Sequence, residues 1–528
     1  MNTLEENLLR RNVVGDTLRR SAARYPDKTA IIFRDKHLTY RELDSSANRW
    51  ANAMLALGLK RGDRVVVVSG NDERFVVVYY GLMKAGLTIV PVNPGLTDDD
   101  MQFIVNGSGS NAIVADDSSL KRLLQMKSKL FTLETYLSVD AGRGDVLGYE
   151  EILAKGEENE PEVVIEDEDA CQILYTSGTE ARPKGIILSH RAIMANCNNV
   201  VIEFPFRVQD IGCLVLPLHH SGGLDVFLSP LIYVGATMVV LGGFDPQEVL
   251  ETIERHKVTT FWGLPIFYRA MMDVPDFDKY DLSSLRLCTY HLAPITTNLL
   301  KEAIEKFGCE FGLTFGLTEM GPVTTVFPPD AQFEKFGSIG RPILSVDLKI
   351  VDGEDNEVPR GTVGEIVYRA PCTMDGYLGL EEKNVETFRG GWLHSGDLAY
   401  MDEDGYVFFV DRSKDIVKSG GENVSSREVE TVLLAHRDVE DVAVIGLPHP
   451  RWGEAVTAVV TARPQATIDE QELIRYSKER LAGFKVPKQV LVLDELPKTA
   501  TGKIQKSVIR QRLIEMSKRD AKTRDRDG

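Results

Sequence analysis

The sequence predicts an α/β fold, because apolar runs of strand length alternate with segments of helical periodicity. Four such runs are Arg64–Val68, Leu87–Val92, Thr237–Leu241 and Ala443–Gly446. With 528 residues, the chain has room for several units of the usual size of about 150 residues. We therefore expect large buried cores and exclude a single small binding module.

Composition and charge exclude several classes of protein. The chain is 43% hydrophobic and 27% charged, which is typical of globular proteins and not of disordered or fibrous ones. Its net charge of −18 repels phosphate polymers and anionic bilayers, so no nucleic-acid partner is expected. The six cysteines are widely spaced without a C-x-x-C pair, which predicts reduced, buried thiols in a cytoplasmic protein.

An uncharged stretch of membrane-spanning length occupies residues Val226–Phe244. Pro230 and Gly235 divide it into a helix-like and a strand-like piece, so no membrane span is predicted. The N-terminus lacks the basic start and apolar core of a signal peptide.

Two charged stretches are expected to be solvated. Residues Glu157–Asp169 contain eight acidic residues and no basic one, which is typical of a solvated loop or linker. Residues Ser517–Gly528 are almost all charged or small and predict a frayed tail.

The segment Tyr175–Gly185 follows a predicted strand and is rich in hydroxyl groups and glycine. Hydroxyl and backbone N–H donors suit phosphate oxygens, and a lysine adds positive charge. The segment is not a Walker A loop, because Pro183 stands where that motif needs glycine and Gly185 follows the lysine where it needs Ser or Thr. An ordinary turn is the alternative. The predicted phosphate-binding residues are Thr176, Ser177, Gly178, Thr179 and Lys184.

This loop resembles the phosphate-binding signature of the adenylate-forming superfamily, which includes acyl-CoA synthetases, firefly luciferase and the adenylation domains of peptide synthetases. Five further matches follow in the family's order: Phe315–Glu319, Gly390–Asp397, Asp411–Lys418, Gly420–Gly421 and Leu496–Ile504. With weaker matches the resemblance covers residues 39–506. It implies an ATP-dependent carboxylic acid:CoA ligase that forms an acyl-AMP intermediate and releases AMP and pyrophosphate.

The resemblance also implies a domain organisation. A large N-terminal domain of α/β subdomains, residues 1–411, would bind nucleotide and acid. A small, mobile α+β domain, residues 412–528, would carry the catalytic Lys503 and turn about a hinge near Lys414.

Several residues receive nucleotide-binding roles from the resemblance. Glu319 matches the magnesium-binding glutamate, and a carboxylate oxygen is a ligand that Mg²⁺ prefers. Thr318 matches a contact to the α-phosphate and is counted with Glu319 as catalytic, while Phe315 matches an aromatic residue that stacks on adenine. Ala293 and Thr314 are the further nucleotide-binding residues of this part of the chain.

The C-terminal motifs supply the remaining roles in adenylation. Asp397 matches the carboxylate that accepts hydrogen bonds from both ribose hydroxyls, and Arg412 matches a second ribose contact. Lys503 matches the lysine that bridges carboxylate and phosphate in the adenylation step. Lys418 matches a lysine near the nucleotide, with an exposed surface charge as its alternative.

Thioester formation and acid binding involve other positions. Gly420–Gly421 match the glycines beside which the pantetheine arm of CoA passes. His220 matches a residue at the mouth of the acyl pocket, and Ser221 stands where amino-acid-activating relatives have an aspartate. His291 and Leu292 replace two usually small residues. We expect them to narrow the pocket, which favours a short, medium-length or aryl acid over a long chain.

The neighbouring pair His219–His220 is not expected to bind a metal, because adjacent side chains point apart in regular structure. Glu180–Ala181 replaces the usual Thr-Gly and places an acid near the phosphates. The expected cofactors and substrates are ATP, Mg²⁺, coenzyme A and a small carboxylic acid. Two alternatives remain: an enzyme that loads a carrier-protein thiol and a non-catalytic nucleotide-binding homologue. A homodimer is left open.

Overall fold

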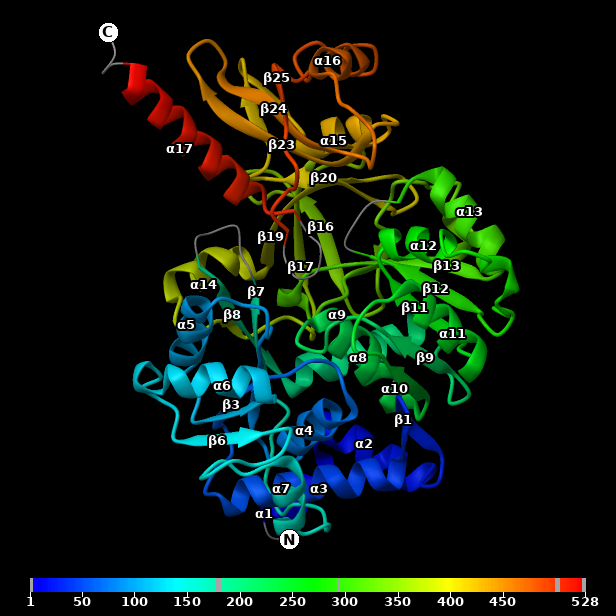
Figure 1. Ribbon diagram of the computed structural model, residues 1–528, viewed down its shortest axis with the longest axis vertical. Coiled ribbons are helices and arrows are strands. Elements are labelled where there is room, and N and C mark those ends of the chain that lie inside the picture. Colours follow the sequence, from blue (N-terminus) through cyan, green and yellow to red (C-terminus); the bar gives the residue numbers. More distant parts are fainter. Residues whose placement is uncertain (1–2, 177–181, 292–294, 499–503, 525–528) are drawn as a thin grey trace. The chain divides into compact units, whose positions relative to one another are not determined.

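The computed structural model describes residues 3–176, 182–291, 295–498 and 504–524 (Figure 1). Within these ranges the chain forms two compact units. Residues 3–176, 182–347 and 368–393 make the first unit, and residues 348–367 and 394–524 make the second. Helices and strands alternate in the larger unit, which confirms the predicted α/β class with a smaller second part. The domain boundary between residues 411 and 412 stays a prediction.

Two sheets form the frame of the first unit, as far as the structure describes it. In spatial order, the nine-stranded sheet consists of β15 (Arg341–Pro342), β14 (Thr325–Phe327), β13 (Glu310–Phe315), β12 (Leu287–Tyr290), β11 (Thr260–Gly263), β9 (Ile211–Leu214), β10 (Thr237–Val240), β1 (Thr29–Phe33) and β2 (Lys36–Thr39). The seven-stranded sheet consists of β18 (Gly376–Tyr377), β8 (Lys184–Ser189), β7 (Ala170–Thr176), β4 (Thr88–Pro91), β3 (Arg64–Val68), β5 (Ala112–Ala115) and β6 (Thr135–Ser138).

The helices of this unit cover the sheets. They are α1 (Thr3–Arg10), α2 (Val14–Arg24), α3 (Tyr40–Ala56), α4 (Glu73–Lys84), α5 (Asp98–Ser108), α6 (Asp117–Gln125), α7 (Tyr149–Lys155), α8 (His190–Glu203), α9 (Ser221–Gly223), α10 (Ser229–Val234), α11 (Pro246–His256), α12 (Pro265–Met272), α13 (Thr297–Phe307) and α14 (Glu381–Thr387). Many begin at a side chain that accepts a hydrogen bond from the first turn, such as Thr39, Asp72 and Ser189.

The buried apolar residues show which helices pack on each of the two sheets. Apolar residues of α11, α12 and α13 pack on one face of the nine-stranded sheet, and those of α5 and α6 pack on the seven-stranded sheet. Helix α4 is buried along nearly its whole length and contacts both β4 and β1. A helix that is apolar on all sides needs cover on all sides, so α4 lies between the two sheets.

The second unit contains two sheets and three helices among its described residues. The four-stranded sheet has the order β16 (Asp347–Val351), β17 (Gly364–Arg369), β19 (Leu393–Met401) and β20 (Val407–Arg412). The five-stranded sheet consists of β22 (Glu422–Val424), β21 (Val417–Ser419), β24 (Gly453–Ala462) and β23 (Val439–His449), with β25 (Gln489–Val492) beside β24. The helices are α15 (Ser426–Leu434), α16 (Glu470–Lys478) and α17 (Lys506–Arg524).

The uncharged stretch forms the two pieces that its sequence predicts. Pro230 lies in the first turn of α10, Gly235 ends that helix with a φ of +83°, and strand β10 follows. None of the helices in the described ranges is long and apolar enough to cross a membrane. The cysteine prediction is also confirmed, because all six thiols are free and buried.

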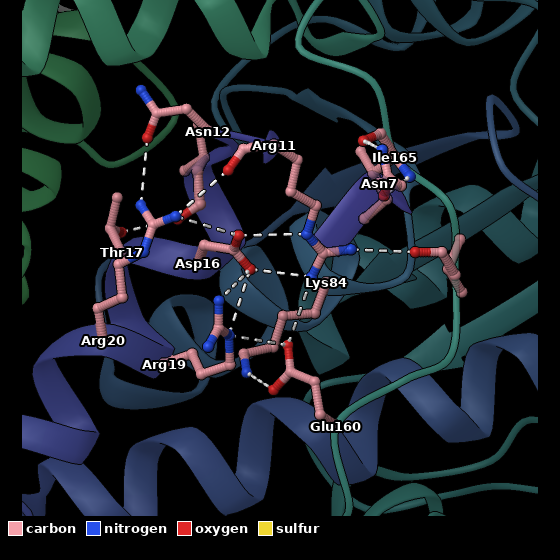
Figure 2. A network of polar contacts seen from close by, with 12 residues as sticks. Asn7, Arg11, Asn12, Asp16, Thr17, Arg19, Arg20, Lys84, Glu160 and Ile165 are labelled. Carbon is pink, nitrogen blue, oxygen red and sulfur yellow. Dashed lines mark hydrogen bonds and ion pairs between the residues drawn. The ribbon is translucent and has the colours of Figure 1, made fainter. Parts of the chain in front are cut away.

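The acidic stretch is a loop, as predicted, and most of its acidic side chains are exposed. Basic residues from earlier in the chain also contact it: Arg11 donates to the carbonyl of Val163, and Lys84 pairs with Glu160 at 2.6 Å (Figure 2). Elsewhere in the loop Arg61 pairs with Asp169 at 2.6 Å. The partners are distant in sequence, so the charge run alone does not reveal them.

The C-terminal stretch differs from the expected frayed tail, because α17 continues to Arg524. Its lysine, arginine, glutamate, methionine and alanine residues have high helix propensity. High charge therefore does not prevent a helix here.

A buried polar pair joins β7 to the segment that precedes α10. Gln172 of β7 donates to Asp225 Oδ1 at 2.8 Å and to the Tyr79 hydroxyl at 3.0 Å, and Asp225 is fully buried. Burial raises the pKa of Asp225 to about 7, although the Gln172 hydrogen bond acts in the opposite direction.

Asp225→Asn should flatten the decline in stability between about pH 4 and pH 7. In that range Asp225 is ionised in the unfolded chain but protonated in the folded chain. The contribution of this group to the free energy of unfolding therefore falls by about 1.4 kcal/mol for each pH unit. Above the folded pKa both states are ionised and the effect is constant. Melting temperatures of variant and wild type at pH 5 and pH 7.5 test this, and an equal pH dependence in both proteins would contradict it.

Candidate active site

The ends of parallel strands bring several predicted residues to one edge of the nine-stranded sheet. Strands β9, β11, β12 and β13 are parallel neighbours, and Gly263, Tyr290 and Leu313 are in register. Thr314 and Phe315 end β13, and His291 directly follows β12. His291 and Thr314 therefore lie at the same level on adjacent strands, at the edge where α/β sheets bind ligands.

The two ends of the predicted phosphate loop face each other. Strands β7 and β8 are antiparallel, and Thr176 pairs with Lys184. Gly185 leaves little room for a side chain, because a Cβ atom there would lie 3.0 Å from the Tyr175 ring. Six predicted site residues lie outside the described residues: Ser177, Gly178, Thr179, Leu292, Ala293 and Lys503.

A tyrosine connects the loop lysine to the predicted metal ligand. Glu319 lies in a short 3₁₀ turn with Thr318. The Tyr377 hydroxyl donates to Glu319 Oε1 at 2.9 Å, and Lys184 Nζ lies 5.4 Å from the centre of the Tyr377 ring. Sequence reasoning missed Tyr377, which lies between the matched motifs. The pairing of β18 with β8 brings it there.

Of the two predicted acid-binding histidines, His291 is buried and His220 is partly buried, and both are neutral at pH 7, as is the neighbouring His219. Burial lowers the pKa values of His219, His220 and His291 to about 4, and the neighbouring His220 adds to this effect at His291. His220 Nδ1 accepts a hydrogen bond from the Gly222 N–H at 3.0 Å, so its proton is on Nε2. Ser221 is buried beside it. No group of three metal-ligating side chains is found among the described residues.

The second unit brings the two predicted ribose-binding residues together. Asp397 of β19 is paired with Arg412 of β20, and Arg412 Nε lies 3.1 Å from Asp397 Oδ1. Asp397 is only 2% exposed. A carboxylate beside a guanidinium offers acceptor oxygens to a ligand, as ribose recognition would require.

The predicted CoA-path glycines form a tight hairpin turn. Gly420 and Gly421 connect β21 to β22 with φ values of +64° and +89°. Positive φ at both central residues defines a type I′ turn and favours glycine, so the turn itself explains the pair. Lys418 lies exposed on β21, and Lys414 lies in the turn after β20. Their predicted roles stay predictions.

Comparisons with known proteins agree with this arrangement. The profile of the family described as "AMP-binding enzyme" matches residues 18–378, and that of the "AMP-binding enzyme C-terminal domain" matches residues 428–503. A feruloyl-CoA synthase of Amycolatopsis sp. is 35% identical over 93% of this chain and 97% of its own length. A fatty acid–[acyl-carrier-protein] ligase, ScoC, of Streptomyces coeruleorubidus is 34% identical over 92% and 94%.

Solved structures show the same fold. ATP-bound MatB from Rhodopseudomonas palustris has a TM-score of 0.86 with 30% identity, and the match covers 95% of this chain and 99% of MatB. The anthranilate CoA ligase AuaEII in complex with anthranoyl-AMP has a TM-score of 0.87 with 29% identity, over 95% and 97%. The chain therefore belongs to the AMP-binding enzyme family, as an AMP-forming acid:CoA ligase.

Proposed function

We propose that the chain joins a compact, ring-bearing carboxylic acid to CoA. The observation that carries this proposal is the group of neutral, buried or partly buried imidazoles at the strand edge, beside the predicted nucleotide residues. Two bulky side chains, His291 and Leu292, stand where relatives usually have small ones, which favours a short pocket. The names of the feruloyl-CoA synthase and the anthranilate CoA ligase, both acting on ring-bearing acids, support the same substrate class.

In the first half-reaction, a carboxylate oxygen of the acid attacks the α-phosphorus of ATP, and the bond to pyrophosphate breaks. Both reactants are anions, so positive groups must offset their charge. Lys184 at the end of the phosphate loop supplies one, and we propose Lys503 as the second. Glu319 would hold Mg²⁺, which would shield the phosphates, and the hydroxyl of Tyr377 orients this carboxylate.

In the second half-reaction, the CoA thiol, losing its proton, attacks the acyl carbon and AMP leaves. We propose that Asp397 and Arg412 hold the ribose, that Lys418 lies near the nucleotide, that the Gly420–Gly421 turn borders the path of the thiol arm, and that Lys414 is the hinge. A carrier-protein thiol is a second candidate acceptor, which the name of ScoC favours. Reduced buried thiols support a cytoplasmic location.

Pyrophosphate release across fatty, aryl and short branched acids, each with and without CoA, tests the proposal. We expect a strong signal for aryl acids that becomes multiple-turnover only with CoA. Highest efficiency at palmitate or longer acids would overturn the compact-acid assignment. Release that CoA does not accelerate would favour a carrier-protein acceptor, and no release with any acid would favour a nucleotide-binding homologue without activity.

A further inference from the structure

His291 is a buried histidine whose hydrogen-bonding capacity is unused. It is 8% exposed, and neither Nδ1 nor Nε2 has a hydrogen-bond partner in the described structure. The buried His190 and the partly buried His220 differ, because His190 Nδ1 accepts from the Val14 N–H and His220 Nδ1 accepts from the Gly222 N–H. A neutral imidazole has one N–H donor and one nitrogen acceptor. Leaving both unpaired in a buried place is unfavourable, so a partner is expected there.

The position of His291 puts this unpaired ring next to the reacting groups. It follows β12, level with Thr314 on β13 and with Leu264 after β11. His220 is close enough to disfavour its protonation. If β13 carries the nucleotide, as the proposed function holds, the acid must approach the α-phosphate at this strand edge. The body of the acid then lies beside His291.

We propose that His291 binds a hydroxyl group on the ring of the acid substrate, and that the enzyme selects hydroxylated aryl acids. A hydroxyl can accept from the imidazole N–H or donate to the other ring nitrogen, so it can pair with whichever of the two nitrogens faces the acid. A second carboxylate would only accept and would bring a charge to a buried place, while an ammonium group would only donate. This inference rests on the proposed function, because it assigns the substrate within the same site.

Pairs of acids that differ only in one hydroxyl test the inference. The full-length enzyme is assayed for pyrophosphate release with benzoate and cinnamate and with their ortho-, meta- and para-hydroxy forms. We expect kcat/KM for one hydroxylated form to exceed that of its parent acid by about 10- to 100-fold. His291→Leu should lower kcat/KM for the hydroxylated acid more than for its parent acid, so that the ratio between the two falls to about one.

Two further variants separate recognition from a structural role. His291→Gln keeps a donor and an acceptor and should retain part of the preference. His37→Leu removes an exposed histidine and should leave the preference unchanged. Protection by ATP against thermal unfolding shows that each variant is folded. An equal loss for hydroxylated and parent acids in both His291 variants would overturn the inference.

The outcomes also separate this inference from the proposed function. If the wild-type enzyme releases pyrophosphate with no acid, the proposed function fails and the inference with it. If it turns over aryl acids without a hydroxyl preference, or if His291→Leu keeps that preference, the function stands and only the role of His291 is overturned.

Discussion

Lys503→Ala is expected to slow acyl-AMP formation by about 10²- to 10³-fold, the usual loss when one donor to a transition state is removed. The reason is electrostatic, because this cation is proposed to offset charge only while the acid attacks the α-phosphate. Thioester formation from supplied acyl-AMP should persist, since that step forms no new bond to phosphorus. Single-turnover measurement of each half-reaction tests this, and equal loss of both would contradict it.

Two other substitutions make the test specific. Lys498→Ala removes a nearby lysine that pairs with Asp441 at 2.6 Å, and it should leave both half-reactions within about twofold, as expected for an exposed pair. Lys414→Pro should have the reverse effect of Lys503→Ala, because a restricted hinge would spare adenylation and block transfer to the thiol. Unchanged overall turnover in that variant would refute the hinge.

The site residues that the sequence predicts lie in short motifs, each of which can be recognised from neighbouring residues in the chain. Ordered motifs located Thr176 and Lys184 at the ends of one hairpin, and they located Asp397 and Arg412, which the structure brings together across a strand pair. These positions are recognisable because loops after strands carry binding residues in a conserved order, and the residue types follow from the chemistry of phosphate and ribose.

The unpredicted parts depend on contacts between distant segments. Tyr377 reaches Glu319 only because β18 joins the edge of the sheet at β8. Likewise, the charge run of the acidic loop does not reveal its ion pairs, because its basic partners, such as Arg61 and Lys84, precede it by many residues. The lack of hydrogen-bond partners at both ring nitrogens of His291 is likewise not predictable from sequence, since burial and partners depend on the fold.

Lys84 is a buried member of the ion-pair network that contacts the acidic loop at Glu160 (Figure 2). Its side chain is 1% exposed and lies 2.8 Å from Asp44 and 2.6 Å from Glu160, and it also donates to Asn48 at 2.8 Å. All four residues belong to the first unit. Glu160 also lies 3.8 Å from Arg19 and 3.9 Å from Arg11. Removal of the lysine therefore leaves mainly Asp44, whose side chain is 18% exposed, poorly compensated.

Lys84→Met is expected to destabilise the folded chain by about 3 kcal/mol, because breaking a buried pair leaves uncompensated charge behind while methionine fills similar space. The shift of the urea midpoint, followed by tryptophan fluorescence, measures this loss.

Lys279→Met is the matched control, because the side chains of Lys279 and Asp276 pair at 2.5 Å but are 74% and 66% exposed. The loss of stability in this variant should stay below about 1 kcal/mol. Adding Asp44→Asn to Lys84→Met should recover part of the stability, since it removes the carboxylate charge that Lys84 offsets at 2.8 Å. Equal shifts for Lys84→Met and Lys279→Met would show that the buried network contributes no more than a surface pair.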